Sequence, residues 1–140
     1  MLLLDNSAWA RLELATLADD RRNEIADMVE SGDIAVCAPF LLEAGWSARD
    51  AADHDQLLAD LRRLPYLAID ADIEQAALAA QADLARRGHH RSASPSDLLI
   101  AACAHANGAG VLHYERDYDR LAQLTSLRFE SRWLAPPGAL

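Results

Sequence analysis

Residues 94–122 read SPSDLLIAACAHANGAGVLHYERDYDRLA, and this stretch indicates the fold more clearly than any other part of the chain. The Ser-Pro pair that opens it is a typical helix start, because Ser serves as an N-cap and Pro fits the first helical turn. We predict a helix over 95–107, which glycine then ends. Residues 111–113 (VLH) predict a short buried strand, and acidic residues follow it at 115 and 117. A helix that leads into a buried strand is typical of an α/β protein.

The rest of the chain alternates in the same way. The other predicted strands cover residues 2–5, 34–37, 66–69 and 128–134, and the other predicted helices cover 6–31 (interrupted near 16–20), 40–49, 53–64, 72–87 and 117–123. Strands that alternate with helices predict a three-layer α/β sandwich around a central parallel sheet of four to five strands. The sequence has no linker, repeat or low-complexity segment, so we expect residues 1–140 to form a single domain.

The charge composition narrows the possible functions. The net charge is −9, which argues against a protein whose whole surface attracts nucleic acid. A nuclease remains possible, because metal ions bound by a carboxylate cluster reverse the local field. The thirteen basic residues are all Arg. The lack of Lys excludes P-loop NTPases, Schiff-base enzymes and receiver domains, each of which needs a lysine for its chemistry.

The distribution of apolar residues bears on location and on the two cysteines. No apolar run approaches the roughly 20 residues of a membrane span, and the first residues lack the basic start of a signal peptide. We therefore expect a cytoplasmic protein with no membrane association. Cys37 and Cys103 lie in apolar stretches without the spacing of metal ligands, which predicts buried free thiols.

Several acidic residues fall where the predicted strands meet their helices. Right-handed crossovers place these junctions at one edge of a parallel sheet, where ligands bind. Asp5 ends the first strand, Glu43 lies early in the helix after the second strand, and Glu115 and Asp117 follow the strand at 111–113. Asp97 lies in the first turn of a helix that must begin at the same edge if the next strand is to run parallel.

Most of these acids also have a structural explanation. Asp97 alone could simply cap its helix, Asp117 could cap the short helix that it begins, and Glu43 could be a solvated helix residue. Asp5 has the least structural purpose, because an acid rarely ends a buried strand. A haloacid-dehalogenase-like phosphatase also has an acid at this point, but it needs a second Asp two residues later, where this chain has Ser7.

Four segments together resemble the VapC toxins of the PIN-domain superfamily. They are LLLDNSAW (2–9), LLEAGWSAR (41–49), the block 96–122 quoted in part above and RWLAPPGAL (132–140). VapC-like proteins are Mg²⁺- or Mn²⁺-dependent endoribonucleases and act as toxins of type II toxin–antitoxin pairs. The resemblance therefore implies a PIN-like fold and a hydrolase that cleaves RNA phosphodiester bonds.

The resemblance also implies a set of metal ligands. The catalytic and metal-binding acids of the family map onto Asp5, Glu43, Asp97 and the pair Glu115 and Asp117. Relatives commonly have Asp-x-Asp at that pair, and Glu115 reaches one methylene further, so we rank Asp117 ahead of Glu115 as a ligand. Ser7 matches a common serine that is expected to orient Asp5 or a metal-bound water. An all-oxygen ligand set favours Mg²⁺, with Mn²⁺ as a substitute.

Further expectations concern substrate and partners. Arg91, with His90 as a weaker second, is the residue that we expect to contact RNA, whereas Arg86 and Arg87 suit the end of a helix. We expect Trp9, Trp46 and Trp133 to pack in the core or in an interface rather than to stack on bases. The resemblance implies a VapB-like antitoxin with a basic segment over the cleft, and a homodimer. The alternative function is a PIN-like module that binds RNA or protein without catalysis.

Overall fold

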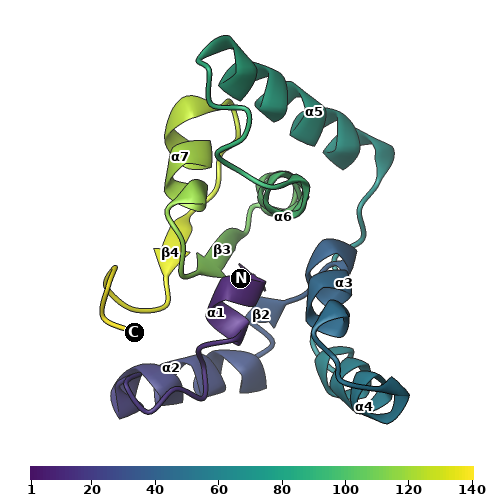
Figure 1. Cartoon of the computed structure of the whole chain (residues 1–140), viewed down its shortest axis with the longest axis vertical. Coiled ribbons are helices and arrows are strands. Elements are labelled where there is room, and N and C mark those ends of the chain that lie inside the picture. The colour runs from purple at the N-terminus through teal and green to yellow at the C-terminus, as the bar shows by residue number, and fades with distance from the viewer.

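A computed structural model describes all residues, 1–140, and has a four-stranded parallel sheet at its centre (Figure 1). The strands are β1 (Leu2–Leu4), β2 (Ile34–Ala35), β3 (Gly110–His113) and β4 (Ser131–Trp133), in the order β2-β1-β3-β4. All three pairings are parallel. The helices α5 (Ala71–Arg86), α6 (Pro95–Ala106) and α7 (Asp117–Leu124) lie on one side and α2 (Asp19–Glu30) lies on the other. The predicted α/β class and parallel sheet are confirmed.

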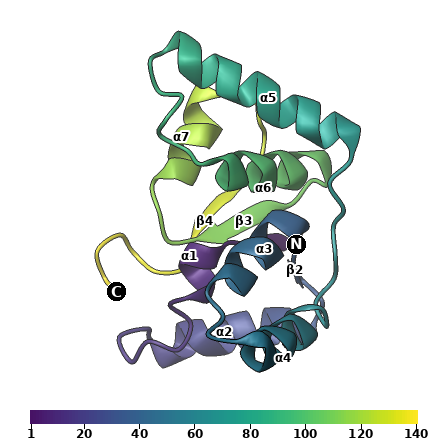
Figure 2. The ribbon, with the colours of Figure 1, turned by 45° about the vertical axis from the view of Figure 1, so that its right-hand side comes forward.

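The core is centred on β1 and α6. Every residue of β1 is buried, because this strand has a neighbour on each side and helices above and below. Helix α6 lies between the sheet and α5 in both views (Figures 1 and 2). Small side chains such as the alanines of α6 allow it to pack closely between these neighbours. The buried residues of α6 are Asp97, Leu98, Ile100, Ala101, Ala102, Cys103 and Ala104. Cys103, like Cys37, is a buried free thiol, as predicted.

The predicted helix over 6–31 is in fact two helices. A single turn, α1 (Asn6–Trp9), follows β1 directly, and α2 begins only at residue 19. The break between them is longer than predicted because the side chain of Arg22 hydrogen-bonds to carbonyl oxygens of this segment in place of helical N–H groups. The guanidinium of Arg22 donates to the carbonyl oxygens of Leu12 (3.2 Å) and Leu14 (2.8 Å). One side chain thus stabilises the non-helical segment.

The predicted strand over 66–69 is wrong. Tyr66 makes one isolated parallel bridge to Val36, and the following residues form no strand. Only two hydrogen bonds join the segments, from Val36 N–H to the Pro65 carbonyl (2.8 Å) and from Leu67 N–H to the Val36 carbonyl (2.9 Å). The neighbouring strand β2 has two residues, so it offers little edge to pair with. The sheet therefore has four strands and no fifth.

The remaining helices match the prediction within a few residues. They are α3 (Ala38–Trp46) and α4 (Ala51–Leu61), while α5, α6 and α7 each end within one residue of the predicted bound. Helix α3 begins before residue 40 because Pro39 is accepted in a first turn. Side-chain caps from Asp50 and Asp70 begin α4 and α5. None of the helices is both long and apolar enough to span a bilayer.

Candidate active site

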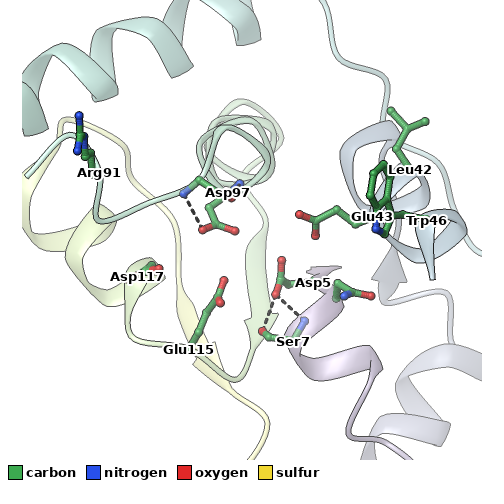
Figure 3. A pocket seen from close by; sticks show the side chains of 11 residues that line it. Asp5, Ser7, Leu42, Glu43, Trp46, Arg91, Asp97, Glu115 and Asp117 are labelled. Carbon is green, nitrogen blue, oxygen red and sulfur yellow. Dashed lines mark hydrogen bonds between the residues drawn. The ribbon is translucent and has the colours of Figure 1, made fainter.

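A cleft of about 800 Å³ opens at the edge of the sheet where the strands end. All five acids singled out in the sequence line it: Asp5, Glu43, Asp97, Glu115 and Asp117. The carboxylates lie in the middle of the cleft, between Arg91 at one end and Leu42 and Trp46 at the other (Figure 3). The parallel topology therefore brings residues from four separate segments of the chain to one place.

Three of the acids form a compact group, which we call the carboxylate trio: Asp5, Asp97 and Glu115. One carboxylate oxygen from each lies within 4.8 Å of those of the other two. Asp5 is 2% exposed and Asp97 is 6% exposed, whereas Glu115 is half-buried. Figure 3 shows the three side chains pointing toward one another from the end of β1, the start of α6 and the turn after β3. Such crowding of like charges is unfavourable unless a proton or a cation lies between them.

Ser7 fixes the orientation of Asp5. The Ser7 N–H donates to Asp5 Oδ2 at 2.8 Å, and the Ser7 hydroxyl donates to the same oxygen. The Ser7 hydroxyl oxygen also accepts from the backbone N–H of Tyr114 at 2.9 Å. Ser7 thus links the start of α1 to the turn after β3. Its contact with Asp5 is the one that the family resemblance implied.

Asp97 caps its helix and also lies in the trio. Its Oδ2 accepts from the Ser94 N–H at 3.0 Å, and its own N–H donates to Ser94 Oγ at 3.1 Å, which together make a capping box. Its other oxygen faces Asp5 and is within reach of the Tyr118 hydroxyl at 3.4 Å. The helix cap therefore also orients the carboxylate in the trio.

The trio is electrostatically suited to a cation. Burial, followed by the charges of Asp97 and Asp5, raises the pKa of Glu115 to about 8. Burial also raises the pKa of Asp97. The neutral form of Glu115 is therefore favoured relative to that of a free carboxyl, and a bound cation would compete with its proton. An all-oxygen donor set fits Mg²⁺ or Mn²⁺ rather than zinc.

Glu43 and Asp117 line the cleft but lie outside the trio. Burial raises the pKa of Glu43, with smaller contributions from Asp5 and Asp97. Asp117 begins α7, and its Oδ1 accepts from Arg120 at 3.3 Å. Glu115 thus lies nearer than Asp117 to the two buried aspartates, although the sequence ranked Asp117 ahead of it as a metal ligand. The extra methylene of Glu115 helps it to reach them from the turn after β3.

Sequence reasoning missed one residue of this site, Tyr118. Its side chain is fully buried, and its hydroxyl donates to Asp5 Oδ1 at 2.7 Å. The available signal was its position one turn before Leu121 on the amphipathic helix α7, which predicts that both are buried. A buried tyrosine hydroxyl usually finds a polar partner, and here the nearest polar groups are the carboxylates.

Of the tryptophans and basic residues singled out in the sequence, Trp46 and Arg91 line the cleft, whereas Trp133 and His90 do not. Trp46 is 91% exposed at the rim of the cleft, so of the two predicted environments, core and interface, it does not have the first. Trp133 is partly buried, and its indole N–H donates to Asp119 at 3.0 Å. Arg91 lines the cleft, whereas His90, its exposed neighbour, does not. Trp46 lies one turn after the exposed Leu42, on the face of α3 opposite to its buried residues.

Comparison of the chain with known proteins identifies its family. The family model described as PIN domain matches residues 2–124. Ribonuclease VapC2 from Mycobacterium tuberculosis is 37% identical over 140 residues, which cover 98% of this chain and 96% of that protein. Ribonuclease VapC18 from the same species is 36% identical over 147 residues, with 98% and 97% covered.

Solved structures share the fold. DNA-bound VapBC from Salmonella typhimurium superposes with a TM-score of 0.71 at 22% identity, over 96% of this chain and 100% of that one. VapBC-5 from Mycobacterium tuberculosis superposes with a TM-score of 0.60 at 24% identity, over 91% and 95%. The likeness in coordinates agrees with the family model and with the two relatives above 30% identity. The chain belongs to the PIN-domain family and, within it, to the VapC type.

Proposed function

We propose that this protein is a Mg²⁺-dependent endoribonuclease that acts as the toxin of a type II toxin–antitoxin pair. The observation that carries the proposal is the carboxylate trio, in which oxygens of Asp5, Asp97 and Glu115 lie within 4.8 Å of one another in an open cleft. Its relatives of similar length bear the name ribonuclease. A domain that only bound RNA or protein would gain nothing from three crowded carboxylates.

The residues of the chain divide the catalytic work by their position. Asp5, Asp97 and Glu115 would hold the ion, while Ser7 keeps Asp5 in place. Bound Mg²⁺ supplies charge that neutralises the phosphoryl oxygens and favours deprotonation of an attacking water. Glu43 and Asp117 flank the trio and can accept hydrogen bonds from waters around the ion. The family resemblance implies products with a 5′-phosphate and a free 3′-hydroxyl.

The two ends of the cleft suit different parts of an RNA strand. Arg91 supplies a positive charge for a phosphate next to the scissile one. Trp46 presents an uncovered aromatic surface on which an unpaired base could stack. The chain carries a net charge of −9, so RNA binding depends on these few contacts rather than on a basic surface.

We further propose a VapB-like antitoxin as partner, acting on a homodimer in the cytoplasm. Several solved relatives are VapBC structures. An acidic cleft on an acidic protein suits a basic antitoxin segment, whose charge would compete with the metal ion and with RNA.

The test is cleavage of single-stranded RNA by the purified protein with Mg²⁺. Asp5→Asn and Asp97→Asn each keep the size of the side chain but remove a charge, and we expect each to abolish cleavage. Asp60→Asn, at an exposed position on α4, is the matched control and should retain full activity. Excess EDTA should abolish cleavage by the wild-type protein. Full activity of Asp5→Asn, or cleavage in EDTA, would overturn the proposal in favour of a different chemistry.

A second measurement separates the enzyme from a non-catalytic PIN-like module. Calorimetric titration with Mg²⁺ or Mn²⁺ should show binding to the wild-type protein and none to Asp5→Asn. A module that only binds RNA or protein would show no ion binding in either case. If the enzyme is confirmed, mapping 5′ ends of cellular RNA after brief induction would identify the target.

A further inference from the structure

The hydroxyl of Tyr118 lies against two members of the carboxylate trio. It donates to Asp5 Oδ1 at 2.7 Å and lies 3.4 Å from Asp97 Oδ1. A phenol has one proton, so Tyr118 can donate to only one of the two aspartates at a time. The 2.7 Å contact with Asp5 is the hydrogen bond in this structure, and the 3.4 Å contact with Asp97 is a second acceptor for the same donor. No other side chain in the protein lies within hydrogen-bond distance of both aspartates. Tyr118 therefore joins the end of β1 to the start of α6.

The contact completes the hydrogen bonding of Asp5. Ser7 donates to Oδ2 of this carboxylate, and Tyr118 donates to Oδ1. With a donor on each oxygen, the carboxylate cannot rotate without losing a hydrogen bond in a site that water barely reaches. The plane of the Asp5 carboxylate is thus fixed before any ion arrives.

Packing holds the ring of Tyr118 independently of its hydroxyl. The ring lies 4.9 Å, centroid to centroid, from that of His113 and 6.4 Å from that of Phe129, in an edge-on arrangement with the latter. Leu121, one turn further along α7, is also fully buried. Burial and the charges of Asp5 and Asp97 raise the pKa of Tyr118 well above its ordinary value, so the hydroxyl remains a donor.

We propose that Tyr118 is a positioning residue that sets the separation and orientation of the Asp5 and Asp97 carboxylates for a divalent cation. This inference rests on the proposed function of the same cleft. Tyr118 does not itself contact the ion: it acts through the two aspartates, because Ser7 and Ser94 hold their Oδ2 atoms and the Tyr118 hydroxyl lies between their Oδ1 atoms. Groups that orient metal ligands in this way typically change metal affinity about 10–100-fold when removed.

The first test is Tyr118→Phe, which deletes the hydroxyl and keeps the ring. The matched control is Tyr114→Phe, because the Tyr114 hydroxyl contacts Pro136 and Leu140 rather than the aspartates. Calorimetric titration should show Mn²⁺ affinity reduced at least about tenfold in Tyr118→Phe and unchanged in Tyr114→Phe. Equal affinity in Tyr118→Phe and wild type would overturn the inference. Absence of ion binding by the wild-type protein would instead overturn the proposed function itself.

A second test uses the wild-type protein and so does not depend on the variant folding. The chain has three tyrosines, at positions 66, 114 and 118, so ¹³Cζ-tyrosine labelling gives three NMR signals. Titration with Mg²⁺ should shift the Tyr118 signal in a saturable way, with the dissociation constant found by calorimetry, because its hydrogen-bond acceptors become ion ligands. The Tyr66 signal should not follow it, since this side chain lies away from the trio. A Tyr118 signal that stays constant while calorimetry shows Mg²⁺ binding would contradict the inference.

Discussion

Ser94 and Asp97 hydrogen-bond to each other in both directions, which makes the first turn of α6 part of the active site. Ser94 Oγ accepts from the Asp97 N–H at 3.1 Å, and Asp97 Oδ2 accepts from the Ser94 N–H at 3.0 Å. The same carboxylate belongs to the trio. An element that begins a helix therefore also sets the direction in which a predicted metal ligand points.

Ser94→Ala should lower both stability and ion affinity. Loss of a serine N-cap costs about 1 kcal/mol. The Asp97 N–H also loses its acceptor, so the first turn that carries this carboxylate is held less firmly, even though the backbone N–H of residue 94 still donates to Asp97 Oδ2. Asp50→Ala, which removes the cap of α4 away from the cleft, should cost a similar amount of stability but leave ion affinity unchanged. Urea unfolding and Mn²⁺ calorimetry measure the two quantities. Equal ion affinity in the two variants would show that the cap of α6 is only structural.

The ion-free protein should lose stability as the pH rises. The pKa of Glu115 is about 8 in the folded protein, above its ordinary value of 4.5. A carboxyl with a raised folded pKa contributes stability that is fully present below pH 4.5 and is lost as the pH rises through about 8. Urea unfolding in EDTA between pH 5 and pH 9 should show this decline in the wild-type protein and a weaker one in Glu115→Gln. Curves of identical slope would contradict the assignment to Glu115.

Glu115→Gln should weaken ion binding more than Asp117→Asn does. Glu115 belongs to the trio, whereas Asp117 lies outside it and pairs with Arg120 at 3.3 Å. Calorimetry with Mn²⁺ on the two variants gives the order directly. The reverse order would restore the ranking that the sequence predicted and would mean that Asp117 leaves Arg120 when the ion binds.

Arg91→Gln should weaken RNA binding in a salt-dependent way. Arg91 lines the cleft, and each phosphate contact with a single strand contributes about 0.7 to the slope of log affinity against log salt. The slope should therefore fall by about that amount in Arg91→Gln. Arg87→Gln, in the same basic stretch but outside the cleft, should leave the slope unchanged. A fluorescent RNA titrated between 50 and 200 mM salt, roughly the range over which such contacts are resolved, provides the measurement.

Trp46→Ala should impair RNA cleavage without destabilising the protein. Trp46 is 91% exposed, and substitutions at such positions usually change stability by less than about 0.5 kcal/mol. Loss of a stacking surface should raise KM several-fold with kcat nearly unchanged. Leu78→Ala, at an exposed apolar position on α5 outside the cleft, is the control. An unchanged KM together with weaker antitoxin binding would assign Trp46 to the protein partner instead.

The sequence predicted the elements that are defined by strong local signals. The Ser-Pro start and the glycine that follows made α6 and its Asp97 predictable, because cap residues and helix stops act over a few positions. The segment 66–69 had the composition of a strand but found only a two-residue neighbour at Ile34–Ala35. Pairing depends on the partner edge, and residue composition alone does not describe that edge.

The site could be predicted in its members but not in its internal order. Topology placed Asp5, Glu43 and the acids after β3 at one edge, and the structure has them in one cleft. Which carboxylates lie within 4.8 Å of one another depends on side-chain reach and on competing partners such as Arg120. The contact of Tyr118 depends on how α7 packs against the rest of the fold. Short-range sequence patterns do not predict that packing.

The members of the trio are far apart along the chain, at positions 5, 97 and 115 of 140. During synthesis, Asp5 leaves the ribosome long before Glu115 is added to the chain. No partial chain that stops short of Glu115 can assemble the trio, however well its first strand and helices fold. On the proposed function, the growing chain therefore has no complete ion site until its translation is almost finished.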